Sequence, residues 1–228
     1  MPELLPLFPL ESVLAPGQPL PLRVFEARYA RLVADVTADG EQRRFGVIGL
    51  KSGFEVDNIA AKTVPATFAS VGTIAEILEM ETVSEGVYRL FLGGSQRFRI
   101  VRIVPSDKPY PLAEVSLLLE TVGGELPLGL LESTQALADE FIRLYREFSD
   151  LEPRRDPDYP TEITLLAHRL AAEPPLSESD RQALLEDDNA VDRLRHLREV
   201  LRRELPLLRR TRTVSVHSGP MFRGLLPN

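Results

Sequence analysis

The amino-terminal stretch of the chain constrains the fold most, because prolines, apolar residues and one charged cluster follow one another there in a restrictive order. Pro6 and Pro9 have no backbone N–H to donate to a sheet, so residues 4–10 are predicted to form a short edge strand. Pro16 and Gly17 predict a turn, because glycine accepts backbone conformations that other residues avoid. A second short strand is expected after this turn.

An amphipathic helix is predicted to follow the second strand. Apolar residues recur there at helical spacing until Asp39-Gly40 ends the pattern. The predicted apolar face consists of Phe25, Tyr29, Leu32, Val33 and Val36. The order of elements is therefore strand, turn, strand and helix.

Residues 44–120 alternate with a period of two, which is typical of strands. Strands are predicted at residues 45–50 (ended by Lys51 to Gly53), 71–81, 87–92, 96–101 and 113–119. Ser84-Glu85-Gly86 indicates a hairpin, and Gly93-Gly94 predicts a break in the ladder with a bulge or a tight bend. About six short strands with one early helix predict a small coiled sheet or pseudo-barrel.

From about Glu125 the pattern becomes helical and predicts a bundle of three or four helices. The expected helices cover residues 130–148 and 163–170, a segment capped by Ser177, and a last helix that starts near Asp188 or Asn189. Pro206 makes a long continuation of the last helix doubtful, because proline costs about 3 kcal/mol inside a helix. The fold class is therefore α+β, with a β-rich subdomain at 1–122, a helical subdomain at 123–210, and a basic tail at 211–228 that is flexible or docks.

Several motifs in this order resemble the amino-terminal substrate-binding domain of the ATP-dependent protease Lon, which also occurs in free-standing bacterial proteins and in cereblon. The matching motifs are LPLFPL at 5–10, VLAPG at 13–17, LPL at 20–22, FEARY at 25–29, VGTIAEI at 71–77, GSQRFRI at 94–100, PYPLAEV at 109–115 and the helical run at 181–204. Ala15 stands where the family often has an aromatic residue. The positions that carry the resemblance are Pro6, Phe8, Pro9, Pro16, Gly17, Phe25, Glu26, Arg28, Tyr29, Gly72, Arg97 and Phe98.

The resemblance implies a protein without catalytic activity that binds exposed apolar segments of unfolded or partly unfolded polypeptides, with a protease or a chaperone as a further partner. Binding is expected on a shallow apolar surface or groove, with the client added as an edge strand as one option. The sequence does not locate that surface. Arg28 could anchor a peptide carboxylate; the favoured interpretation makes Glu26 and Arg28 partners that hold the helix on the barrel, with Tyr29 in the core.

Two other function classes stay open at this point. One is a small-molecule-binding protein or a hydrolase with a pocket at the barrel mouth or at the junction of barrel and helices. The other is a regulatory module that docks through its tail, where Met221, Phe222, Leu225 and Leu226 are apolar.

The residue types present argue against an enzyme, a metal site or a bound cofactor. No G-x-x-x-x-G-K-[ST] loop occurs, and the nearest glycine cluster, Gly93 to Arg97, lacks the lysine that such loops need. Without cysteine, thiolate catalysis and Cys-containing zinc sites are excluded, which fits a reducing cytoplasm. His168 and His196 are expected to face solvent and His217 lies in the tail. The carboxylate pairs Glu79/Glu81 and Asp187/Asp188 are expected to be solvated.

The charge of the chain is divided unevenly along its length. Residues 1–192 carry 18 Lys+Arg and 32 Asp+Glu, hence −14, whereas residues 193–228 carry 9 and 2, hence +7. A basic last helix beside an acidic body is the simplest interpretation, and a nucleic-acid partner is not expected because the basic footprint is confined to one end. No apolar run is long enough to span a membrane, and no leader pattern is recognised, so neither secretion nor a membrane is expected.

Overall fold

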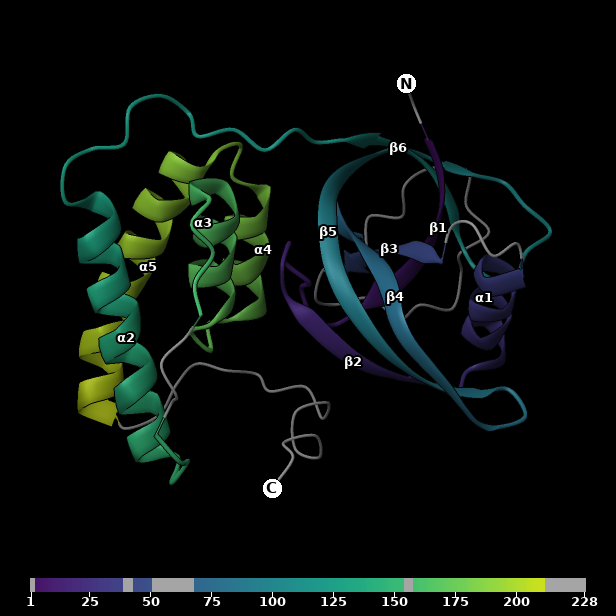
Figure 1. Ribbon diagram of the computed structural model, residues 1–228, viewed down its shortest axis with the longest axis horizontal. Helices are drawn as coiled ribbons and strands as arrows, with labels where there is room; N and C mark the ends of the chain where they lie inside the picture. The colour runs from purple at the N-terminus through teal and green to yellow at the C-terminus, as the bar shows by residue number, and fades with distance from the viewer. Residues whose placement is uncertain (1–2, 39–42, 51–67, 154–157, 212–228) are drawn as a thin grey trace. The chain divides into compact units, whose positions relative to one another are not determined.

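The computed structural model describes residues 3–38, 43–50, 68–153 and 158–211 (Figure 1). These residues form two compact units, one up to Leu119 and one from Glu120 onward. The first unit contains β1 Glu3–Leu10, β2 Pro19–Val24, α1 Ala27–Ala38, β3 Arg44–Gly49, β4 Val71–Ser84, β5 Val87–Val104 and β6 Leu112–Leu117. The second contains α2 Leu130–Phe148, α3 Ile163–Ala172, α4 Glu178–Glu186 and α5 Ala190–Thr211. The predicted α+β class, with six strands and an early helix followed by helices, is confirmed.

Some sequence-based predictions fall outside the described residues. They are the strand and helix stops at 39–40 and 51–53, the tail 212–228 with its apolar residues, and His217.

The six strands form one sheet that closes on itself. Their order is β2-β5-β4-β3-β1-β6, and β6 pairs in addition with β5. Closure depends on the length of β5, whose first half pairs with β2 and whose second half, from Phe98, pairs with β6. The prediction that Gly93-Gly94 separates two strands is wrong, because both glycines lie inside β5. The register with β4 does shift next to them, which confirms the predicted bulge.

Strand β1 is not the predicted edge strand, because it pairs on both sides. Residues 3–6 pair antiparallel with β6, and residues 7–10 pair parallel with β3. The N–H of Leu7 donates to the Pro111 carbonyl at 2.9 Å, so alternation directs the backbone of Pro9 toward β6 and that of Pro6 toward β3. Pro6 faces β3, whereas its half of β1 pairs with β6; Pro9 faces β6, whereas its half pairs with β3. The missing N–H of each proline therefore removes no ladder bond.

The predicted turn at Pro16-Gly17 is present and fixes β2 against β5. Gly17 has φ 73°, and the N–H of Gln18 donates to the Ala15 carbonyl at 3.1 Å. Gly94 meets this turn closely, since its N–H donates to the Gln18 carbonyl at 2.9 Å. A Cβ at Gly94 would lie 2.2 Å from the Ala15 oxygen, so this contact requires glycine.

Helix α1 supplies one wall of the barrel core. Its buried side chains include Tyr29, Leu32 and Val33, as predicted, and they join the core cluster of β1, β3, β4 and β5. Phe25 was expected on the same face, but it precedes the first turn of α1 and is 68% exposed. The predicted apolar face therefore begins two residues before the helix does.

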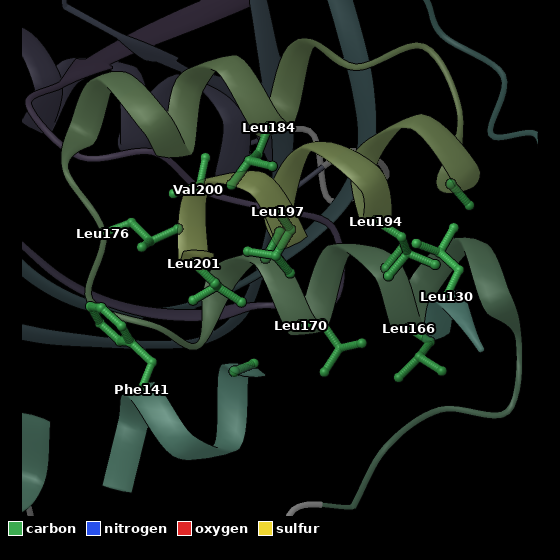
Figure 2. Packing of buried hydrophobic residues seen from close by; sticks show 14 of the residues in the cluster. Leu130, Phe141, Leu166, Leu170, Leu176, Leu184, Leu194, Leu197, Val200 and Leu201 are labelled. Carbon is green, nitrogen blue, oxygen red and sulfur yellow. The ribbon is translucent and has the colours of Figure 1, made fainter. Parts of the chain in front are cut away.

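The helical unit is organised around α5, against which α2, α3 and α4 all pack. Ten of the seventeen buried residues in its core are leucines, and the others are alanines, valines and Phe141; Figure 2 shows many of these side chains between α5 and its neighbours. Ser177 caps α4 as predicted, because its Oγ accepts the Asp180 N–H at 3.2 Å. Pro206 does not end α5, which continues to Thr211. The buried Leu205 and Leu208 on either side of Pro206 favour helix there and offset the lost backbone bond.

Of the two histidines expected in solvent, His168 is buried and His196 is partly buried. His168 is 1% exposed and its Nε2 lies 3.1 Å from a Glu120 carboxylate oxygen, while the buried Arg193 lies 3.9 Å from the same oxygen. Since α3 packs against both α4 and α5, its buried face is wider than the single stripe that the spacing predicts. His196 is half-buried, and its Nδ1 lies 3.0 Å from an Asp187 carboxylate oxygen. Burial raises the pKa of Asp187, and the nearby His196 acts in the opposite direction.

Arginines of α5 bind carboxylates of neighbouring helices. Arg203 donates to both oxygens of Asp180 at 2.9 Å, and Arg209 lies 2.5 Å from Glu140. These ion pairs join the basic last helix to acidic residues of its neighbours. This arrangement agrees with the interpretation drawn from the charge distribution.

Candidate functional site

The positions that carry the family resemblance lie mostly in the interior of the first unit. Buried are Phe8, Pro9, Pro16, Tyr29, Gly72, Arg97 and Phe98; half-buried are Pro6 and Arg28; exposed are Gly17, Phe25 and Glu26. Gly72 is needed where it stands, because a Cβ there would lie 2.4 Å from the Val47 carbonyl oxygen and 2.6 Å from the Phe98 ring. Most of the resemblance thus describes how the barrel packs.

The Glu26, Arg28 and Tyr29 cluster forms a local structure at the start of α1. An Arg28 nitrogen lies 2.8 Å from the Glu26 carboxylate, and the Arg28 guanidinium stands 4.7 Å above the centre of the Tyr29 ring. The Tyr29 ring in turn stacks on Phe8 with centroids 4.2 Å apart, and burial raises the pKa of Tyr29 to about 12. The cluster links β1 to α1 through the aromatic rings, and the ion pair stays on the surface.

A second polar contact fixes the other end of α1. Asp35 accepts hydrogen bonds from Lys108 at 2.7 Å, Tyr110 at 2.6 Å and Arg31 at 2.8 Å. The hydrogen bonds from Lys108 and Tyr110 hold the pKa of Asp35 below its usual value. These groups are all partnered with one another, so the contact attaches α1 to the segment before β6.

Apolar side chains are grouped on the outside of the sheet, over β2, β5 and β4. We define the outer patch as Pro19, Pro21, Leu78 and Phe91. Leu78 is 56% exposed and Phe91 is 41% exposed. Pro21 is the cross-strand neighbour of Phe91, and Pro19 is that of Gly93. A Cβ on Gly93 would lie 3.2 Å from the Leu78 side chain. The four residues of the patch therefore adjoin one another. Grouped exposure of this kind differs from the scattered apolar residues of any protein surface.

The patch continues into an arm, residues 78–91, in which β4 and β5 extend as a hairpin (Figure 1). The predicted hairpin is confirmed, because Ser84 pairs with Val87 across a turn in which Gly86 has φ 70°. Every β4 residue of the arm is exposed. The arm carries three acidic residues, Glu79, Glu81 and Glu85, and one basic residue, Arg89. Arg89 binds Glu81 at 2.5 Å.

The exposure of Leu78 was missed from the sequence. The strand pattern places Ile77 and Leu78 on opposite faces, and the register between β4 and β5 shifts beside Leu78. The available signal was the adjacent pair of large apolar residues in an otherwise alternating strand, which indicates either a doubly buried strand or an apolar outer face.

The described residues offer no cluster of metal-ligating side chains. In residues 3–38, 43–50, 68–153 and 158–211, no three His, Cys, Asp or Glu side chains come together in a way that could hold a metal ion. Gly93 and Gly94 belong to an extended strand and Arg97 is buried, so this cluster does not form a phosphate-binding loop. None of the helices in the same ranges is long and apolar enough to cross a membrane.

Residues 4–203 match the model of a family described as the ATP-dependent protease La (LON) substrate-binding domain. The chain is 29% identical over 217 residues to Lon protease 2 of Myxococcus xanthus, and 27% identical over 221 residues to Lon protease 1 of Herpetosiphon aurantiacus. These alignments cover 92% and 91% of this chain but only 24% and 25% of the two relatives. The chain therefore spans about a quarter of the length of the curated relatives it matches.

Solved structures show the same similarity. The crystal structure of a Lon N-terminal domain protein from Xanthomonas campestris matches with a TM-score of 0.61 and 32% identity, over 86% of this chain and 96% of that one. The N-terminal domain of a Mycobacterium avium complex Lon protease matches with a TM-score of 0.58 over 88% of this chain and 98% of that one. At 18% identity, the second comparison concerns the fold alone.

Proposed function

Because this chain belongs to the family of the ATP-dependent protease La (LON) substrate-binding domain, we propose that it binds exposed apolar segments of client polypeptides and catalyses no reaction itself. The observation that carries the proposal is the outer patch, which exposes Leu78 and Phe91 beside two prolines. Burying one such side chain contributes about 1.5–3 kcal/mol. Two such side chains give micromolar binding only when the surrounding contacts contribute as well. An affinity in this range suits a receptor that must release its clients.

The proposal is tested by binding of a chain that cannot fold. We suggest a fluorescently labelled, reduced and alkylated lysozyme, with binding measured by fluorescence anisotropy. The double variant Leu78→Ser/Phe91→Ser is expected to raise Kd at least about tenfold, because each tenfold step corresponds to about 1.4 kcal/mol. Leu128→Ser is the matched control, since Leu128 is fully exposed but lies outside the patch and in the second unit.

Two results would contradict the proposal. One is the absence of any binding of the unfolded lysozyme by the wild-type protein. The other is equal binding by the double variant and by Leu128→Ser, which would show that the outer patch is not the surface used. Because both substituted side chains are exposed, melting temperatures close to that of the wild type are expected and serve to exclude unfolding as the cause.

A further inference from the structure

The backbone directions in β5 decide which strand edges are open. The N–H of Gly94 donates to the Gln18 carbonyl, so Gly94 directs its backbone polar groups toward β2. Strand β5 pairs with β2 without a register shift from Gly93 to Tyr88. Alternation therefore directs the backbone groups of Leu92, Leu90 and Tyr88 toward β2, and those of Phe91 and Arg89 toward β4.

The same alternation shows that the outer edge of β2 is blocked. Leu20, Leu22 and Val24 direct their backbone groups at β5, which leaves Pro19, Pro21 and Arg23 directed at the outer edge. Two of these three residues are prolines and have no N–H to donate. Prolines at such positions prevent another strand from pairing there.

The outer edge of β4 carries no such block. In the arm, Glu79 pairs with Phe91 and Glu81 with Arg89, so these two glutamates direct their backbone groups at β5. Met80 and Thr82 consequently direct theirs away from β5. The pairing of β4 with β3 ends before the arm, at Glu76, so within the described residues no strand covers this edge. The strand contains no proline.

The side chains along this edge alternate in character. Glu79 and Glu81 lie on one face, and Met80 and Thr82 on the other, next to the buried Leu90. Glu81 is neutralised by Arg89, whereas Glu79 has no ion-pair partner in the part of the chain that the structure describes. A neighbouring strand places its side chains beside those of the same face, where opposite charges stabilise the pair and like charges destabilise it.

We propose that clients add to the outer edge of β4 at residues 79–82 as an extra strand, and that segments alternating Lys or Arg with apolar residues are preferred. The basic residues lie beside Glu79 and Glu81, and the apolar residues lie beside Met80 on the opposite face. Backbone hydrogen bonds provide the affinity and the alternating side chains provide the preference. This inference rests on the proposed function and adds a second contact to it. Because Glu79 pairs with Phe91 and lies on its face, the outer patch holds apolar residues of the client outside the segment that pairs with β4.

The preference is measured with two labelled peptides of equal length, one alternating Val with Lys and one alternating Val with Glu. Binding followed by anisotropy at low salt is expected to be at least about tenfold tighter for the lysine peptide, and the difference is expected to shrink as salt is added. A version of the lysine peptide with alternate N-methylated amides keeps the charges but loses backbone donors, and it is expected to bind at least about tenfold more weakly than the unmodified peptide.

The edge itself is tested by Met80→Pro, which removes an outward N–H, with Met80→Val as the matched control that keeps it. Loss of peptide binding in the proline variant alone is the expected result. Glu79→Lys, compared with Glu79→Gln, changes only an exposed side chain and does not depend on how the strand tolerates proline. It is expected to weaken the lysine peptide at least about fivefold relative to Glu79→Gln.

The outcomes separate this inference from the proposed function. If unfolded lysozyme binds the wild type, but Met80→Pro binds it as tightly as Met80→Val does, the edge mode is refuted and the proposed function stands. Equal affinity for the lysine and glutamate peptides overturns the stated preference. Failure of the wild type to bind unfolded lysozyme refutes the proposed function itself.

Discussion

Replacing Phe8 by alanine is expected to destabilise the barrel strongly. Phe8 is 5% exposed, stacks on Tyr29 at 4.2 Å and lies 5.7 Å from the centre of the Phe45 ring. Burial of roughly 150 Å² of ring surface at about 25 cal/mol per Å² corresponds to about 4 kcal/mol. Measured phenylalanine-to-alanine changes in cores cost about 3–5 kcal/mol, which includes the cavity left behind. We therefore expect a loss of this size.

The assay is thermal unfolding followed by circular dichroism. For a chain of this length, each kcal/mol changes the melting temperature by about 2–4 °C, so Phe8→Ala is expected to lower it by about 6–20 °C. Phe25→Ala provides the matched control, because it removes the same side chain from the same family motif region at a position that is 68% exposed. Its effect is expected to stay within about 0.5 kcal/mol.

Equal destabilisation by the two alanine variants would refute the reasoning, because it would mean that burial does not distinguish them. A Phe8→Ala protein within about 1 kcal/mol of the wild type would do the same, since neither the ring stacking nor the buried area could then be as described. Phe8→Leu keeps most of the volume and is expected to fall between the wild type and alanine.

Four other changes test separate features of the fold. Arg28→Ala is expected to cost only about 1–2 kcal/mol, since it removes one exposed ion pair and one cation–π contact; a loss above about 3 kcal/mol by urea titration would contradict this. Gly94→Ala is expected to cost more than about 2 kcal/mol, because its Cβ would lie 2.2 Å from the Ala15 oxygen, and urea titration checks it. Asp35→Asn is expected to lower the melting temperature at pH 7 but not near pH 2. The pKa of Asp35 is depressed in the folded state. The stabilisation by the Asp35 carboxylate is therefore present above about pH 4 and is lost as the pH falls through this folded-state pKa. Pro206→Ala is expected to raise the urea midpoint, by up to about 3 kcal/mol of stability, because it restores a helix N–H.

The order of secondary structure was predictable because local signals and burial agree along most of the chain. A continuous apolar run marks the buried strand β3, alternation marks the buried positions of β6, and apolar residues at helical spacing mark α2 and α5. The cap at Ser177 and the turn at Gly17 depend on residue types whose backbone preferences are local. Prediction failed where the outcome depends on a distant element. Pro206 is kept in a helix by packing on either side, and His168 is covered because two helices flank α3.

The location of the candidate site could not be predicted, because exposure of an apolar residue is a property of the closed sheet. Phe91 has the sequence context of a strand residue like any other, and only the direction of its side chain separates it from the buried Leu90 and Leu92. The bulge beside Leu78 shifts the register and hence the face. These features depend on strand pairing, which a single sequence does not specify.

The prolines show most clearly how topology assigns a role to a residue. Pro6 and Pro9 face the unpaired sides of β1, where a missing N–H has no effect on the ladder. Pro19 and Pro21 face the outer edge of β2, where the same missing N–H prevents another strand from adding. Of these four prolines, the first two therefore lie within the paired sheet and the last two close one of its edges. Since β4 has no proline along its own outer edge, the proposed pairing with a client strand is open at the arm and not at β2.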